Sequence, residues 1–316
     1  MGLQHIYPHN NILMGRFINP FTDVGFKKIF GQEYSKPLLI DFLNNLLKDA
    51  GITDVSFLDK EKPGEFGDDR IIVYDLFCKT DKGDHFIVEM QNDLYSYFKN
   101  RTLYYAARAI VDQGKPGKEW KYNLSPVYVV SFINDYKKSF SQDFRTDVML
   151  LDTHNHKPFV EKLHFIYLQL PLFQKKKEQC KSNFDRWIYV LKNMETLHRI
   201  PWAARNEIFK KLEELSEKSA LTKEERHQYE IYQMAQWDHN YLWGDAIEKG
   251  LKEGMEKGME KGMEKGMKEG IEKGMEKGKT DTLRDVVMRM MAANQSIQLI
   301  SQFTGLTPDE ISKYTS

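Results

Sequence analysis

Residues 70–91 hold the strongest constraint on the fold, because two apolar runs there flank a short polar turn. The runs are rich in Ile, Val, Tyr and Phe, and Gly83 stands in the turn Asp81-Lys82-Gly83-Asp84. β-Branched and aromatic residues favour strands, and a glycine suits the left-handed position of a tight turn. The stretch therefore predicts a β-hairpin whose otherwise apolar strands contain two acids, Asp75 and Glu89.

The length of the hairpin loop decides whether the two acids meet. A three-residue loop, Asp81 to Gly83, places Asp75 directly opposite Glu89, and opposed side chains share one face of a sheet. Gln91, two residues beyond Glu89, points the same way because side chains alternate along a strand. A two-residue loop would put the acids on opposite faces. We predict the three-residue loop.

A facing pair of carboxylates with an amide alongside is typical of a site for a hard divalent cation. Mg²⁺ takes oxygen ligands, commonly one or two carboxylates completed by water and a substrate phosphate. Asp75 and Glu89 are the expected metal ligands, and Gln91 is the group expected to hydrogen-bond an attacking water. A buried ion-pair network is the alternative interpretation of the same acids.

The other patterns predict a mixed sheet covered by helices. Helices are expected at 19–30, 36–49 and 93–113, and strands at 54–60, 126–133 and 164–170. Asn19-Pro20 is the expected start of the first helix, with Asp23 in its first turn. Asp23 is either an acid favoured by the helix dipole or an additional acid of the site. The nearly continuous apolar run at 126–133 indicates a central strand.

Beyond residue 180 the pattern is only helical. The helices between 181 and 247, one of which begins with a capping box at Thr222, are expected to pack on the same core. Glycine then recurs every four residues from Gly250 to Gly278, with Glu and Lys between the repeats. We expect a repeat helix over 248–279 that associates with a second copy, because small residues at this spacing let helices approach closely. A solvated helical spacer is the alternative.

The tail, 280–316, returns to a globular pattern. Thr280-Asp281 is the expected cap of a helix through Met291, Ser296 to Phe303 is a second helix, and a third begins at Thr307. The last two have the outline of a helix-turn-helix. DNA reading by this tail is disfavoured, because the last helix offers only Lys313 for phosphate contacts.

Composition excludes several classes of protein. The 46 Lys and Arg residues balance the 46 Asp and Glu residues, so bulk charge indicates neither nucleic acid nor membrane. Two cysteines suit a reducing compartment, and the cytoplasm is expected. No leader pattern or membrane-length apolar segment is recognised. The histidines lack a Gly-x-Ser-x-Gly or cysteine-centred motif as partner, and no glycine-rich phosphate loop follows a strand.

Three segments together resemble one known family. They are Asn19-Pro20-Phe21-Thr22-Asp23-Val24-Gly25-Phe26-Lys27-Lys28-Ile29-Phe30-Gly31, Asp75 with Glu89-Met90-Gln91, and the helix that carries Arg101, Tyr105 and Ala106. They look like the recombination-promoting nuclease/putative transposase family of the PD-(D/E)XK nuclease superfamily. The likeness covers about residues 17–245, and the Glu/Lys/Gly/Met repeat resembles the C-terminal extension of many members.

The resemblance implies an α/β, restriction-endonuclease-like core at 1–180, in which helices flank a mixed β-sheet. A helical extension at 181–247, the repeat helix at 248–279 and the small tail at 280–316 would follow. It also implies Mg²⁺-dependent endonuclease cleavage of DNA, in a bacterial mobile-element or recombination context.

The resemblance also implies residue roles. By position, Asp75 is the metal-binding Asp, Glu89 is the second acid, Gln91 stands where the motif has Lys, and Asp23 takes the place of a first-helix acid. The basic residues near these acids are the candidates for DNA contact, namely Arg101, Arg108, Lys115, Lys118 and Lys121. A catalytically silent DNA-binding or scaffold protein and a transposase that joins strands are the alternative functions.

Overall fold

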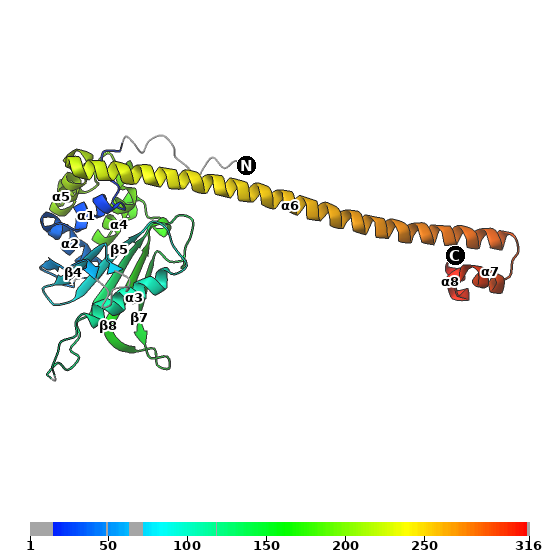
Figure 1. Ribbon diagram of the computed structural model, residues 1–316, viewed down its shortest axis with the longest axis horizontal. Helices are drawn as coiled ribbons and strands as arrows, with labels where there is room; N and C mark the ends of the chain where they lie inside the picture. The colour runs from blue at the N-terminus through cyan, green and yellow to red at the C-terminus, as the bar shows by residue number, and fades with distance from the viewer. Residues whose placement is uncertain (1–14, 49, 63–71, 118, 315–316) are drawn as a thin grey trace. The chain divides into compact units, whose positions relative to one another are not determined.

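The computed structural model of the chain describes residues 15–48, 50–62, 72–117 and 119–314. The chain divides into two compact units, the first ending at Met234 and the second beginning at Ala235. In the first unit, helices cover a twisted β-sheet (Figure 1). This arrangement confirms the predicted mixed sheet flanked by helices.

The strands are β1 (Val55–Phe57), β2 (Glu61–Lys62), β3 (Ile72–Val73), β4 (Leu76–Thr80), β5 (His85–Gln91), β6 (Val127–Ile133), β7 (Arg145–Leu151) and β8 (Pro158–Gln169). The helices of the first unit are α1 (Asp23–Phe30), α2 (Lys36–Leu46), α3 (Phe98–Val111), α4 (Asn183–Asn193) and α5 (Glu207–Ser216). Helix α6 (Lys223–Ala292) continues from the first unit into the second, which also contains α7 (Ile297–Thr304) and α8 (Pro308–Lys313).

Among the described residues, the main sheet has the strand order β1-β4-β5-β6-β8-β7. Strand β6 lies between β5 and β8 and runs parallel to both, while the other neighbours are antiparallel. Six of the seven β6 residues are buried, which agrees with the central strand predicted from its apolar run. Strands β2 and β3 form a separate two-stranded ribbon.

Each face of the sheet carries its own hydrophobic core, because side chains alternate along the strands. On one face, Phe132 of β6 packs on Phe42 of α2 with ring centroids 5.3 Å apart, and Trp187 of α4 contacts the same aromatic group. On the other face, Phe98 of α3 lies edge-on against Tyr167 of β8, at 5.6 Å. Helix α3 therefore covers the face opposite to that covered by α1, α2, α4 and α5.

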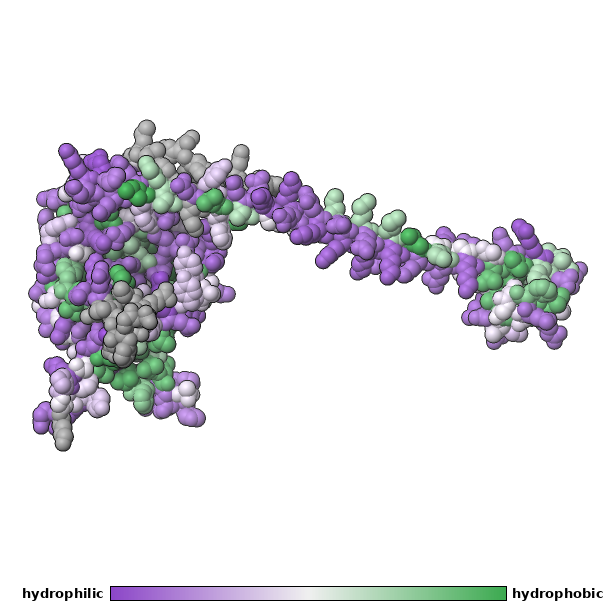
Figure 2. Space-filling model, in the orientation of Figure 1, coloured by the Kyte–Doolittle hydropathy of each residue, from purple (hydrophilic) through white to green (hydrophobic). Residues whose placement is uncertain are grey.

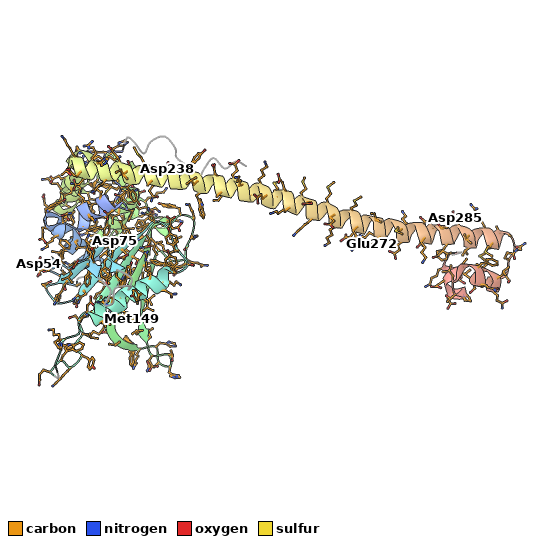
Figure 3. The ribbon with its side chains drawn as sticks, viewed as in Figure 1. Asp54, Asp75, Met149, Asp238, Glu272 and Asp285 are labelled. Atoms are coloured by element: carbon orange, nitrogen blue, oxygen red, sulfur yellow. The ribbon has the colours of Figure 1, made fainter. Side chains whose placement is uncertain are left out.

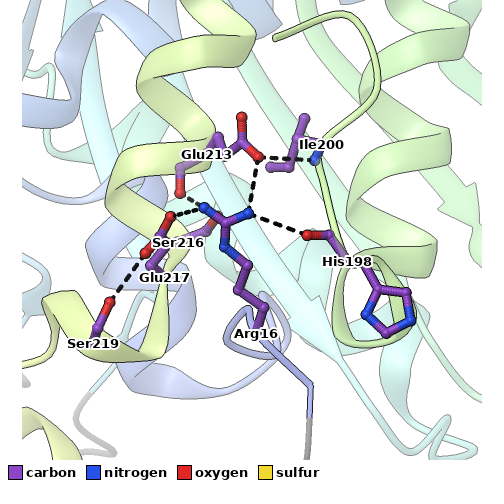
Figure 4. Close-up of polar contacts among 7 residues, drawn as sticks. All are labelled: Arg16, His198, Ile200, Glu213, Ser216, Glu217 and Ser219. Atoms are coloured by element: carbon purple, nitrogen blue, oxygen red, sulfur yellow. Dashed lines mark hydrogen bonds and ion pairs between the residues drawn. The ribbon is translucent and has the colours of Figure 1, made fainter.

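The segment before α1 is held against the end of α5. Arg16 pairs with Glu217 and lies 3.7 Å from Glu213, and its Nη1 donates to the carbonyl of His198 at 3.2 Å (Figure 4). The Ile18 amide donates to the Ser216 carbonyl at 2.8 Å. These contacts join residues about 200 positions apart. Trp187, Phe209 and Leu212, from the helices after residue 180, also lie in the same core as α1 and α2.

Helix α1 begins three residues later than Asn19-Pro20, so the predicted start is wrong. The Asn19 side chain accepts from the Phe21 amide at 2.7 Å and forms a turn instead. Thr22 is the N-cap, because its hydroxyl accepts from the Gly25 amide at 2.9 Å. Gly25 is required here, since a Cβ at this position would lie 2.0 Å from the Asn19 carbonyl oxygen.

Two further predictions need correction. Helix α3 begins at Phe98 rather than near Asp93, because the Asp135 carboxylate accepts from the Leu94 amide at 2.8 Å and holds that segment out of the helix. Strand β7 was not predicted, since its seven residues lack apolar alternation and all are at least partly exposed. Its strand conformation comes from pairing with β8, which begins well before residue 164.

In the second unit, α6 is continuous through Thr280, so the predicted helix cap at Thr280-Asp281 is wrong. The Thr280 hydroxyl donates to the Glu276 carbonyl one turn back, at 2.9 Å, instead of capping a new helix. Helices α7 and α8 begin as predicted, with Ser296 and Thr307 as N-caps. Val287, Ile300 and Ile311 form their small core. In the described part of the chain, no helix combines the length and apolarity that crossing a membrane requires.

Candidate active site

The β4–β5 hairpin has the predicted register. Leu76 pairs with Val88 and Lys79 with His85, and the Thr80 amide donates to the Asp84 carbonyl at 2.9 Å. Gly83 has a φ of 93°, in the left-handed region that glycine accepts without strain. The loop is therefore the three-residue one.

This register brings Asp75 and Glu89 together at the start of β4. The Asp75 amide donates to Oε1 of Glu89 at 3.2 Å, and the Met90 amide donates to Oδ2 of Asp75 at 2.7 Å. The first apolar run is not one strand, however, because the chain bends at Tyr74-Asp75 between β3 and β4. The bend brings the Asp75 main chain and side chain to the facing strand at once. Figure 3 labels Asp75 among the strands of the first unit.

Both carboxyl groups lie where ionisation is unfavourable. Glu89 is only 3% exposed, and its pKa is raised well above the usual range, mainly by burial and further by the negative charge of Asp75. Burial also raises the pKa of Asp75, and Asp23 adds to this rise. The Met90 amide, Arg101 and Lys60 favour ionised Asp75 and oppose the increase. For both carboxyl groups, burial and the neighbouring acid thus outweigh the contacts that favour the ionised form.

Polar side chains continue from Glu89 across the sheet. Ser131 of β6 is the strand partner of Glu89, and Tyr167 of β8 is the partner of Ser131. The Ser131 hydroxyl is buried and has no hydrogen-bond partner among the described residues. Gln91 is 6% exposed and points to the same face as Glu89, because it lies two residues further along β5.

The structure places the other predicted site residues in three different settings. Asp23 is exposed in the first turn of α1, paired with Lys27 at 2.8 Å, and its charge acts on Asp75. Arg101 acts on both Asp75 and Glu89, and its guanidinium lies 5.8 Å from the centroid of the Tyr105 ring. It therefore belongs with the acids.

The remaining basic candidates lie further along α3 and beyond it. Arg108 pairs with Asp112 at 2.8 Å. Lys115 and Lys121 are exposed in the loop after α3, while Lys118 lies outside the described residues. The helix from Arg101 to its end is about 15 Å long at 1.5 Å per residue. This loop and the acids are therefore separate parts of one side of the sheet.

Sequence reasoning missed two neighbours of the acid pair, Ser131 and Lys60. Ser131 interrupts the apolar run of β6, and this interruption could have signalled it. Lys60 has no such signal, because its position depends on the pairing of β2 with β3.

The residues present fit a divalent metal ion. One carboxylate on β5 and a second on the bend before β4 are a sufficient protein contribution for Mg²⁺, which keeps several waters. A bound cation would favour the ionised form of both carboxyl groups, which burial disfavours, and Ser131 leaves a buried hydroxyl beside Glu89. Within the described residues there is no group of three or more His, Cys, Asp and Glu arranged to hold a metal. Any metal here would therefore take its other ligands from water or substrate.

The mixed sheet with helices on both faces defines an α/β fold of the restriction-endonuclease type. Residues 20–246, more than half of the chain, match the family described as PD-(D/E)XK nuclease family transposase. The chain belongs to this family. Comparison with curated proteins and with solved structures gave no match. Membership supports a nuclease-like or transposase-associated role, and nucleases of this kind generally use divalent metals.

Replacing Glu89 with glutamine is expected to stabilise the metal-free protein at alkaline pH. An acid with a raised pKa binds more protons in the folded than in the unfolded state, so its contribution to stability falls as pH rises above the unfolded pKa. A pKa shift of one unit between the unfolded and folded states changes the free energy of unfolding by up to about 1.4 kcal/mol. In EDTA, Glu89→Gln should exceed the parent in free energy of unfolding at about pH 8, and the difference should shrink toward the ordinary pKa of glutamate.

Urea unfolding of the first unit over a series of pH values measures this difference. Glu207→Gln is the matched control, because the Glu207 side chain is 91% exposed and should give no such pH dependence. If the Glu89→Gln protein is less stable than the parent at about pH 8, the ionised Glu89 carboxylate is stabilised by its neighbours in the folded protein and the prediction is wrong.

Proposed function

We propose that this protein is a Mg²⁺-dependent DNA endonuclease that hydrolyses phosphodiester bonds. The observation that carries the proposal is the facing pair of buried Glu89 and partly buried Asp75, in which the Asp75 amide donates to Glu89 and the Met90 amide donates to Asp75. The family supports a nuclease and DNA as its substrate. Together they favour a metal site over a structural ion-pair network, since neither acid forms an ion pair with another described residue and burial raises both pKa values.

Each residue has a separate role in this proposal. Asp75 and Glu89 hold Mg²⁺, which when bound lowers the pKa of a water and stabilises charge on the phosphate. Gln91 orients the attacking water through its amide, which hydrogen-bonds but carries no charge. Arg101 favours the ionised form of both carboxylates. Asp23, an exposed residue whose charge acts on Asp75, is the additional acid of the site.

The exposed basic loop after α3 is the proposed contact for the DNA backbone. Lys115 and Lys121 are exposed there, and Lys118 stands between them in the sequence. Arg108 would contribute from α3 if its pairing with Asp112 is exchanged for a phosphate. Contacts of this kind position a duplex without reading its sequence.

The proposed setting is the cytoplasm of a bacterium, in recombination or the movement of mobile elements. Its support is the family description, which names a transposase. Cys78 and Cys180 are free and buried, which agrees with a reducing compartment. Because the family description names a transposase, strand transfer is the second candidate reaction.

Supercoiled plasmid should be nicked by the parent protein with Mg²⁺ and left intact with Ca²⁺ or EDTA. Asp75→Ala and Glu89→Ala should each lower the rate more than about 100-fold, because each removes one of two proposed metal ligands. Glu161→Ala is the control, since Glu161 is an exposed acid in β8. Gel electrophoresis measures the rate.

The products separate the candidate reactions. Nicked and linear products indicate hydrolysis, whereas joined molecules would indicate strand transfer. Cleavage that survives both substitutions would reject the proposed site, and binding without cleavage under all conditions would favour the silent scaffold.

Charge reversal in the basic loop should weaken DNA binding and flatten its dependence on salt. Each lost phosphate contact reduces the slope of log K against log salt by about 0.9. Lys115→Glu with Lys121→Glu should do this in fluorescence anisotropy with Ca²⁺, whereas Lys210→Glu on α5 should not. Equal slopes for the two proteins would place the DNA elsewhere.

We further propose that the repeat helix, 248–279, associates with a second copy. Its apolar side chains are strongly exposed, from 54% for Ile271 to 77% for Met263, and in Figure 2 hydrophobic residues follow one side of this stretch. A Cβ built on any glycine from Gly250 to Gly278 would meet nothing within 4 Å. Each glycine costs about 0.8–1 kcal/mol relative to alanine in a helix, and close approach of a partner helix would offset this.

The charges of the repeat favour a parallel pair. In most repeats Glu follows the apolar residue and Lys precedes the next glycine, as in Met259-Glu260-Lys261-Gly262. At 100° per residue, the Glu row lies beside the apolar row and the Lys row beside the glycine row. Two parallel helices that meet through their apolar and glycine rows bring the Glu row of one toward the Lys row of the other.

Replacing Gly258, Gly262 and Gly266 by alanine should dissociate this oligomer while raising helicity. The added methyl groups block close approach, although alanine favours the isolated helix. Analytical ultracentrifugation and circular dichroism measure the two effects, and truncation after residue 246 should also give the monomer. Gly244→Ala is the control, because Gly244 lies in α6 before the repeat and is equally unobstructed. If helicity rises while the mass of the oligomer is unchanged, the repeat helix is a spacer and does not mediate association.

A further inference from the structure

The proposed nuclease site has a neutral side chain where its family's motif has a lysine. Gln91 can orient a water, but its amide cannot balance charge that develops on a phosphate. Both acids of the pair repel a DNA phosphate when they are ionised, and a cation beside them would offset this repulsion in addition to the metal. This reasoning rests on the proposed function.

A main-chain hydrogen bond holds Lys60 next to the residue that precedes Asp75. Lys60 lies between β1 and β2, and its carbonyl accepts from the Tyr74 amide at 3.1 Å. The pairing of Glu61 with Val73 continues this antiparallel ribbon and fixes its register. Tyr74 directly precedes Asp75. The lysine is thus held one residue from the acid across the ribbon, although the two are fifteen apart in sequence.

The Lys60 side chain is half-buried and makes no hydrogen bond or ion pair with another described residue. The charged groups that act on it are Asp75, Asp23 and Lys27. Burial is the largest cause of its lowered pKa, followed by the charge of Lys27, and the two acids oppose the change. An ammonium group in this setting is poorly hydrated and lacks a fixed partner, which leaves it able to bind an anion.

We propose that the Lys60 ammonium contacts the DNA phosphate at Asp75 and supplies the positive charge that Gln91 lacks.

The two cations near the acids differ in position. Arg101 acts on Asp75 and on Glu89, the more deeply buried of the pair, and lies over the Tyr105 ring. Lys60 acts on Asp75 and on the exposed Asp23. A phosphate must approach from the exposed side, because Glu89 is only 3% exposed. Lys60 therefore acts on the more exposed acid, beside which its main chain lies, while Arg101 also acts on the buried one.

Lys60→Met tests the proposal, with Lys60→Arg as the conservative variant and Lys79→Met as the matched control. Lys79 is an exposed lysine at the far end of β4. With plasmid DNA and Mg²⁺, Lys60→Met should lower kcat about 100-fold with KM changed less than about threefold. Lys60→Arg should recover most of kcat, and Lys79→Met should match the parent. Thermal unfolding of each variant checks the fold.

A second measurement uses the metal alone. Removing a positive charge near Asp75 should tighten Mn²⁺ binding about fivefold by calorimetry in Lys60→Met, and not in Lys60→Arg or Lys79→Met. Unchanged Mn²⁺ affinity would place Lys60 away from the acids and overturn the inference. If the parent cuts DNA and Lys60→Met cuts it at the same rate, only the role of Lys60 is contradicted. If the parent cuts no DNA, the nuclease proposal itself is contradicted.

Discussion

The antiparallel pairing of β4 with β5 is the interaction on which the acid pair and the order of the main sheet depend. Burying unpaired carboxylates costs several kcal/mol, so such a pair persists only where the fold enforces it. Here the enforcement is by the main chain, since the amides of Asp75 and Met90 each hold one carboxylate oxygen. Neither contact supplies a positive charge to the pair.

The sheet makes this arrangement rigid. Strand β5 lies between β4 and β6, and β6 is itself paired on both sides, so Glu89 cannot move without breaking central pairing. Aromatic packing on the face of Phe132 and the cover of α3 on the opposite face hold the layers together. Asp75 instead lies at a bend between two strands, where one side of the pair stays open. Glu89 is buried and Asp75 is partly exposed, and this geometry suits a substrate that approaches from the side of Asp75.

The repeat helix, unlike the first unit, has no hydrophobic core among its own described residues. Its glycines and exposed apolar residues contribute nothing to a core of their own within 248–279, whereas the tail beyond it has the small cluster of Val287, Ile300 and Ile311. A helix that tolerates so many unfavourable residues needs compensation from outside itself. The proposed helix association would provide such compensation, and it would also couple copies of the first unit through their C-terminal segments.

Local chemistry let the sequence alone determine the hairpin loop, the facing acids, the central strand and the caps at Thr222, Ser296 and Thr307. A glycine in the turn and an alternating strand specify register over a few residues, and capping depends on neighbours three positions away. Only the tertiary structure decided the start of α1, the strand β7 and the position of Lys60 and Ser131 beside the acids. These features depend on pairing between distant segments, for which a single sequence carries no local signal.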